Sequence, residues 1–420
     1  MRYRMDTLRR GLSMAVTAAL LSLYIAGCGA ENEVRPTITI SPDGVEHVAW
    51  RGLPDVELDI ERVADWDLWD PSGDYLFNDI VSVDGGVDRF FLLDAGNRQV
   101  VVVDATGSVE RVLSREGSGP GELRIPTWLD VRGEEVWVAD VANRRFALFG
   151  AAGGDFLADR RWPGSARIVN PFRVIQNDDV LHGGSWPLTV AELALMDPVY
   201  YLARFAMDAG SAGPGGSVGS SSQGVADTLL IVPAPPYMSV PMTDREGQTR
   251  LPYFGFPAFS EELRWDARGG TVVTVSATDY SIEIREPDGR LYREIRLAAA
   301  DLPITDAHRA WYWDEVFPRQ FFSQEPYEPS AGSRDRFPFA EHLPAVSGIA
   351  LDTGGRVWVE ANLPDPGRTR LDLWSLDGSY LGHAYDLPLP VAFLEDGTFL
   401  VQSPGPDGLD RYATRRLRLF

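Results

Sequence analysis

Two segments of the chain are copies of one another, and their spacing limits the folds that the chain can adopt. Residues 90–104 read FFLLDAGNRQVVVVD and residues 136–150 read VWVADVANRRFALFG. They align without a gap, so that Asp94 corresponds to Asp140, 46 positions later. A repeat of about 40–50 residues is the size of one four-stranded β-propeller blade. The repeat therefore predicts an all-β fold built of blades.

Hairpin turns of one type recur along the chain. A glycine follows an apolar strand and precedes another at Gly107, Gly153, Gly289 and Gly378. Tight hairpin turns need a positive φ, which glycine adopts at no steric cost. Together with the apolar patterns, these turns predict six strand-rich segments. They are residues 78–113, 129–162, 170–205, 263–297, 346–387 and 391–420.

The last segment is one strand short of a four-stranded sheet, whereas residues 37–50 form a strand pair without a partner. Pairing the two would close the ring and cover both sheet edges. We therefore expect residues 37–420 to form an all-β, six-bladed β-propeller of four-stranded antiparallel blades, closed by pairing of the N- and C-terminal strands. A Gly/Ser-rich loop at residues 210–224 and an aromatic insertion at residues 301–343 interrupt it.

The N-terminus has the three parts of an export signal. Arginines at positions 2, 4, 9 and 10 precede an apolar run over residues 12–25, which has the length of a signal-peptide core and is short for a membrane span. The run ends in IAGC, residues 25–28, which resembles a bacterial lipobox. The resemblance implies that residues 1–27 are a signal peptide, that Cys28 receives a lipid, and that residues 28–36 are a lipidated tether.

Lipidation at Cys28 would tie the protein to a membrane, since each buried methylene contributes about 0.8 kcal/mol. We expect a bacterial cell-envelope protein on the periplasmic or cell-surface face. The outer membrane is favoured because Gly29, rather than aspartate, follows the cysteine. The formal charge of −22 argues against a nucleic-acid partner, because phosphate binding needs a basic surface.

The connection between the two copies carries a family resemblance. Residues 121–126 read GELRIP and residues 138–145 read VADVANRR. A Gly-Glu-Phe-like turn, a proline and a V-x-D-x-x-N-x-R hairpin in this order resemble the repeat of the NHL-type six-bladed β-propellers. The resemblance is tight over residues 78–162 and gives out between residues 208 and 257. Related propellers include amidating lyases and lactonase-like enzymes that hold Zn²⁺ or Ca²⁺ in the central channel.

We interpret Asp94 and Asp140, with the asparagine and arginine that follow each, as turn residues. Asp and Asn side chains bond nearby backbone in tight turns, and arginine can bridge neighbouring blades. Gly215, Ser217 and Gly219 match the esterase motif, but they lie in the Gly/Ser-rich loop, where no strand-turn-helix holds the serine. No catalytic residue is predicted.

The histidines show no metal-site spacing. Ligands from separate blades would leave no such spacing in the sequence. No cofactor is therefore predicted, while Ca²⁺ or Zn²⁺ in the central channel stays open. The five histidines are His47, His182, His308, His342 and His383.

The insertion at residues 301–343 is the main candidate for a binding site. Asp306 is expected to cap a short helix that runs to Phe317. Loops on a rigid scaffold often carry function, and aromatic side chains near arginines suit a sugar, a peptide or an anion. The alternative is that the aromatic residues form a satellite core that caps one end of the propeller. The predicted ligand-binding residues are Trp311, Trp313, Arg319, His342 and Trp186.

These features favour a membrane-anchored extracytoplasmic β-propeller that binds a protein, a peptide or a saccharide. Two alternatives stay open. One is a metal-dependent lactonase- or lyase-like enzyme with its site in the central channel, and bound metal would favour it. The other is an envelope-assembly scaffold, which co-purifying partners would favour.

Overall fold

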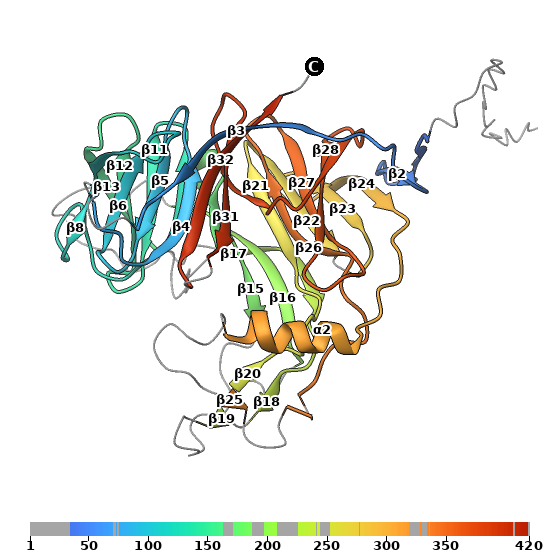
Figure 1. The fold of residues 1–420 in the computed structure, drawn as a ribbon. Coiled ribbons are helices and arrows are strands. Elements are labelled where there is room, and N and C mark those ends of the chain that lie inside the picture. The colour runs from blue at the N-terminus through green and yellow to red at the C-terminus, as the bar shows by residue number, and fades with distance from the viewer. Residues whose placement is uncertain are drawn as a thin grey trace, which may run out of the picture. The chain divides into compact units, whose positions relative to one another are not determined.

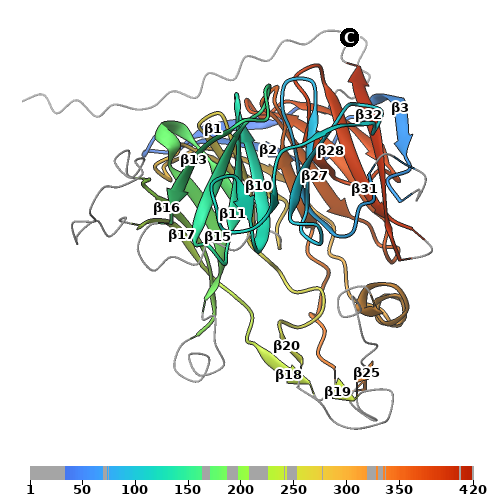
Figure 2. The same ribbon diagram turned by 90° about the vertical axis from the view of Figure 1, so that its left-hand side faces the viewer.

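Six sheets are arranged as blades in a ring, so the protein is an all-β, six-bladed β-propeller as predicted (Figures 1 and 2). The structure is a computed structural model. It describes residues 34–69, 73, 75–162, 171–186, 197–207, 226–240, 242–243, 253–276, 278–318, 328–329, 334–335, 337–405 and 408–418. The blades all belong to the compact unit Val34–Phe420.

The first three blades follow one another along the chain, each running from its innermost to its outermost strand. Blade one consists of β4 (Ile80–Gly85), β5 (Phe90–Asp94), β6 (Gln99–Val103) and β7 (Val109–Val112). Blade two consists of β10 (Pro126–Arg132), β11 (Glu135–Asp140), β12 (Arg145–Gly150) and β13 (Phe156–Arg161). Blade three consists of β14 (Phe172–Val174), β15 (Val180–Trp186), β16 (Val199–Phe205) and β17 (Ala226–Pro233), with the 3₁₀ turn η1 (Gln176–Asp178) after β14.

The other three blades complete the ring. Blade four consists of β21 (Arg264–Arg268), β22 (Thr271–Ser276), β23 (Ser281–Arg285) and β24 (Leu291–Leu297). Blade five consists of β26 (Val346–Leu351), β27 (Arg356–Asn362), β28 (Thr369–Ser375) and β29 (Tyr380–Tyr385). Blade six consists of β30 (Pro390–Phe393), β31 (Thr398–Pro404), β32 (Asp410–Arg418) and β3 (Asp59–Trp66).

Within the described ranges, three short strand pairs lie outside the blades. They are β8 (Arg115–Glu116) with β9 (Glu122–Leu123), β18 (Met238–Val240) with β20 (Tyr253–Gly255), and β19 (Met242–Thr243) with β25 (Glu328–Pro329).

The middle strand β5 is apolar on both faces because blade one packs between two other blades. All residues of β5 are buried, and Phe91 and Leu93 on one of its faces pack against Leu129 and Val138 of blade two. The four predicted glycine hairpins are present, and each joins the third and fourth strands of its blade.

The ring closes in blade six, where β3 pairs antiparallel with β32, from Asp59 opposite Arg418 to Trp66 opposite Tyr412. Strands from the N- and C-terminal parts of the chain therefore share one sheet, as predicted. The prediction that residues 37–50 supply the N-terminal partner is wrong. They form β1 (Thr37–Ile40) and β2 (Glu46–Trp50), and β2 pairs in parallel with β24 on the outside of blade four.

Packing explains the position of β2. Val48 and Trp50 are buried in the core shared by blades four and five. The Trp50 indole donates a hydrogen bond to the carbonyl of Gly378 at 3.2 Å and meets the ring of Trp374 at 5.9 Å. In β3, by contrast, only Trp66 is fully buried, so this outer strand shows little apolar pattern.

The fourth strand of blade three also differs from the prediction. The predicted segment, residues 170–205, ends with β16, whereas the sheet is completed by β17. β17 follows residues 208–225, which lie outside the described residues, as does the predicted Gly/Ser-rich loop at 210–224. Because so many residues separate β16 from β17 in the sequence, the sequence pattern did not indicate that these two strands are neighbours in one sheet.

Asp94 and Asp140 hold turns, which confirms their structural interpretation. Both are fully buried, and they accept the backbone N–H groups of Asn78 at 3.0 Å and Ile125 at 3.1 Å. Each also accepts the side-chain amide of the asparagine three residues later, at 2.9 and 2.6 Å. Arg98 donates to a backbone carbonyl of the next connection at 3.0 Å.

Replacing Gly107 with alanine is expected to destabilise the protein more than the same change at Gly133. Both glycines lie in hairpin turns with positive φ, +87° and +56°, where a side chain costs about 1–2 kcal/mol. A Cβ at Gly107 would lie 2.5 Å from Cγ of Trp66 on the closing strand, whereas a Cβ at Gly133 meets nothing within 4 Å.

Thermal unfolding of the two variants checks this prediction. We expect a clearly lower Tm for Gly107→Ala than for Gly133→Ala, because only the first change presses on Trp66 of β3. Equal Tm values would show that Trp66 moves aside at no cost and would contradict a tightly packed closure.

Candidate functional site

The insertion between blades four and five carries the one α-helix of the described residues, on one side of the ring. It is α2 (Asp306–Trp311), continued by the π-helical turn η2 (Tyr312–Val316). Both views place α2 below the blades, on the same side as β18 and β20 (Figures 1 and 2). π-helical turns are rare and occur often at functional sites.

The helix begins differently from the prediction. Thr305, and not Asp306, is the N-cap, and it forms a capping box with His308. The Thr305 backbone N–H donates to Nδ1 of His308 at 3.1 Å. Asp306 is instead the first helical residue, where its charge favours the positive end of the helix dipole.

Trp313 belongs to an aromatic cluster behind the helix. Its ring lies 4.8 Å from that of Phe337, and the guanidinium of Arg334 lies 5.0 Å above its ring. The cluster also holds Val240 and Ala258 from the segments before blade four. Trp313 thus sits in the satellite core that was the alternative interpretation of the insertion.

Trp311 faces a different environment. It lines a cavity of about 440 Å³ between the helix and the ends of blades four and five. Its ring stacks on that of Phe259, with centroids 6.0 Å apart and planes at 10°. Polar groups from several elements share this cavity, which we call the α2 cavity. They are Glu262, Arg264, His308, Ser347, Glu360, Asn362, Asp365 and Arg368.

His308 in the wall of the α2 cavity has one unused nitrogen. The side chain is 3% exposed, and among the described residues Nε2 has no hydrogen-bond partner. Because Nδ1 accepts the Thr305 N–H, a neutral ring carries its proton on Nε2. A buried donor without an acceptor costs about 1–3 kcal/mol, and an acceptor that reaches Nε2 through the side chains that cover it would remove that cost.

Glu360, on β27, is the carboxylate of the α2 cavity that lacks a cation. It accepts the Ser347 hydroxyl at 2.7 Å, and in the described part of the chain no arginine or histidine pairs with it. The cavity's two arginines have other partners, Arg264 with Glu262 at 3.0 Å and Arg368 at the rim with Asp386. Glu360 can therefore accept hydrogen bonds from a ligand.

The other predicted site residues that the structure describes do not line the α2 cavity. His342 lines an adjoining cavity of about 850 Å³ and approaches Asp301 at 3.3 Å. The two cavities share Pro257, Ser260, Leu343 and Pro344 in their walls. Trp186 ends β15, while Arg319 and Cys28 lie outside the described residues.

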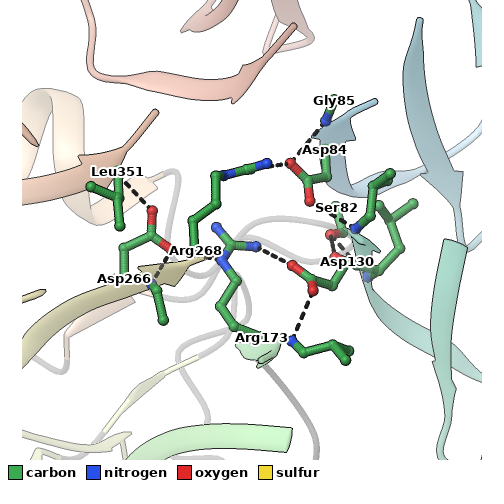
Figure 3. A network of polar contacts seen from close by, with 12 residues as sticks. Ser82, Asp84, Gly85, Asp130, Arg173, Asp266, Arg268 and Leu351 are labelled. Carbon is green, nitrogen blue, oxygen red and sulfur yellow. Dashed lines mark hydrogen bonds and ion pairs between the residues drawn. The ribbon is translucent and has the colours of Figure 1, made fainter. Parts of the chain in front are cut away.

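The central channel holds a network of charged side chains that the sequence analysis missed (Figure 3). Arg173 of β14 contacts Asp130 of β10 at 3.2 Å and Asp266 of β21 at 2.6 Å. Arg268 of β21 reaches Asp84 of β4 at 2.9 Å. These ion pairs connect the innermost strands of blades one to four.

Each channel carboxylate also accepts a backbone hydrogen bond from another blade. Asp84 accepts the backbone N–H of Val131 at 2.9 Å, and Asp130 accepts that of Val174 at 2.8 Å. Asp266 accepts the backbone N–H of Leu351 at 2.8 Å. Asp84 and Asp130 are 46 positions apart, so they follow the period of the repeat, a signal that was present in the sequence.

Three carboxylates and two guanidinium groups leave the channel network one negative charge in excess if all are ionised. Burial raises the pKa of Asp130 to about 7, against the opposing effect of Arg173. The pKa of Arg173 is raised, because Asp266 and Asp130 outweigh the effect of its burial. A proton on Asp130 makes the network neutral.

The described residues contain no group of three or more His, Cys, Asp or Glu side chains placed to hold a metal ion. In the channel, the carboxylates face guanidinium groups. Among the described helices, none has the length and apolar character needed to cross a membrane.

No family model matches the sequence, and a search of curated proteins finds no relative. The chain is similar in structure to a protein of Bacteroides fragilis thought to be exported, at 11% identity and a TM-score of 0.45 over 89% of this chain and 100% of the other. It is also similar to a DUF4221 family member from Bacteroides vulgatus, at 10% identity and a TM-score of 0.45 over 87% and 99%. The PQQ-bound aldose sugar dehydrogenase of Streptomyces coelicolor gives 11% identity and a TM-score of 0.38 over 87% and 100%. Similarity at this level assigns no ligand or reaction to the chain.

Proposed function

We propose that this propeller is a lipid-anchored, extracytoplasmic binding module related to the NHL-repeat propellers. The export signal that ends in Cys28 supports the anchor and the compartment. The repeated turn and hairpin over residues 78–162 supports the family relation. The ligand site of the module is the α2 cavity.

The ligand that suits the α2 cavity is neutral and rich in hydroxyl groups, such as a mono- or disaccharide. Glu360 needs a donor, and the unpartnered Nε2 of His308 needs an acceptor. A hydroxyl group serves as both. An anion would meet an uncompensated carboxylate, and an ammonium group would leave the histidine unpaired. The aromatic wall at Trp311 suits the apolar face of a sugar ring.

The unpartnered Nε2 of His308 is the observation that carries this proposal. Buried polar groups are almost always hydrogen-bonded, and an exception calls for an explanation, such as a bound water or another molecule that completes the site. The volume of about 440 Å³ falls in the range of small-molecule sites.

Replacing Glu360 with glutamine is expected to weaken saccharide binding at least tenfold. The change keeps the shape of the side chain but removes the charge, and a hydrogen bond to a charged group is worth about 1.5–3 kcal/mol. The protein without its lipid is screened on an array of neutral saccharides, and the best binder is titrated by calorimetry.

Glu261→Gln is the matched control, because Glu261 is exposed and lines the adjoining cavity but not the α2 cavity. It should leave the affinity unchanged. Equal affinities of the Glu360→Gln variant and the parent, or tighter binding of citrate than of any saccharide, would refute the proposed ligand class.

A further inference from the structure

β1 is an unusual edge strand. It is the outermost strand of the six-stranded sheet β1-β2-β24-β23-β22-β21, so no other strand in the described part of the chain pairs with its free side. All four of its residues are exposed, with Ile38 at 56% and Ile40 at 73%. Edge strands are usually protected by charges, prolines or a covering segment. β1 reads TITI and carries no charge.

The two isoleucines extend an apolar stripe beyond the core. Alternate residues of a strand share a face, and Ile38 lies opposite Val48 in the pairing of β1 with β2. Val48 is buried between blades four and five, whereas Ile38 and Ile40 continue the same face into solvent. There Ile40 lies opposite Glu46, a carboxylate paired with Arg293. This stripe is thus an apolar surface without a partner inside the described chain.

The position of the stripe along the chain indicates what covers it. Ile38 lies ten residues after Cys28, so the chain between them spans at most about 35 Å. If Cys28 carries lipid, as in the proposed function, β1 is held within that distance of the membrane surface. The strand also lacks the negative charge that dominates a chain with a formal charge of −22.

We propose that β1 lies on the lipid surface, with Ile38 and Ile40 inserted in the interface between headgroups and acyl chains. This inference rests on the lipid anchor of the proposed function. Two side chains alone would bind a bilayer weakly, but the anchor keeps them at a high local concentration. The rim of the propeller at blade four then faces the membrane, and both ends of the ring face water.

The test places a fluorescent label on β1 of the lipidated protein. Once Cys28 is acylated the chain has no other cysteine, so Ile40→Cys supplies a single thiol. Leu157→Cys on β13 of blade two is the control, because Leu157 is also an exposed apolar residue, at 50%. The variants are reconstituted in phosphatidylcholine vesicles that contain lipids with a spin label near the headgroup.

We expect the spin-labelled lipids to quench a label at position 40 at least threefold more strongly than a label at position 157. Equal quenching in vesicles that float with the protein would overturn the placement of β1 on the lipid surface while leaving the anchor intact. Failure of the protein to float would refute the anchor, and with it this inference. A stable dimer in detergent that shields the label at position 40 would assign β1 to a second copy instead.

Discussion

Replacing Arg173 with methionine is expected to lower the free energy of unfolding by about 3–5 kcal/mol, the usual effect of removing one partner from a buried ion pair. Arg173 joins Asp130 and Asp266 and so links blades two, three and four across the channel. Its removal leaves Asp266, which is buried, without a cation. Chemical unfolding monitored by tryptophan fluorescence measures the change.

Two further variants make the expectation specific. Arg290→Met removes an exposed ion pair with Glu286 and should cost less than about 1 kcal/mol. The double variant Arg173→Met/Asp266→Asn should be more stable than Arg173→Met alone, because position 266 then no longer holds a buried carboxylate without its cation. If Arg173→Met were no more damaging than Arg290→Met, the network would not hold the blades together.

The number of blades was predictable because its signals are local. The 46-residue spacing of Asp94 and Asp140 and the glycine turns depend only on nearby residues, and the structure contains both. The partner of each strand was harder to predict. A period-2 pattern identifies a strand but does not say which edge it joins. Residues 37–50 were therefore assigned to blade six, although Trp50 is buried between blades four and five.

The candidate site was predicted only in part. Trp311, one of the predicted binding residues, lies in a cavity wall, whereas Trp313 packs in a satellite core. The capping role of His308, which places it in the cavity wall, was not predicted because the usual capping box has Glu or Gln three residues after the N-cap, whereas here a histidine fills that position. Glu360 had no local signal, since β27 and α2 meet only in the folded chain.

In the channel network, too, some residues had a signal in the sequence and others had none. Asp84 and Asp130 follow the repeat and could have been found by extending the alignment a few residues towards the N-terminus. Residues 265–270 read WDARGG and align with LDVRGE at 129–134, so Asp266 and Arg268 fall on Asp130 and Arg132, whereas Arg173 has no such counterpart. The ion pairs form only because blades one to four bring these side chains to one axis.

The contribution of Asp130 to the free energy of unfolding is expected to fall as the pH rises from about 4 to about 7. Its pKa is about 7 in the folded protein, against an ordinary value of 3.8 for the unfolded chain. Between these values the folded protein holds a proton that the unfolded chain has released. Proton binding favours the folded state at low pH, and this contribution is lost as the pH rises through the folded pKa.

Asp130→Asn isolates this effect from that of other titrating groups. Asparagine keeps an oxygen for the Val174 N–H and mimics the neutral carboxyl, so it should be tolerated at pH 5 and should stabilise the protein relative to the parent at pH 8. Each unit between the two pKa values corresponds to about 1.4 kcal/mol. Unfolding in urea at both pH values gives the difference between parent and variant. A variant that is equally destabilised at pH 5 and pH 8 would show that Asp130 is ionised throughout, and that the channel keeps its excess negative charge.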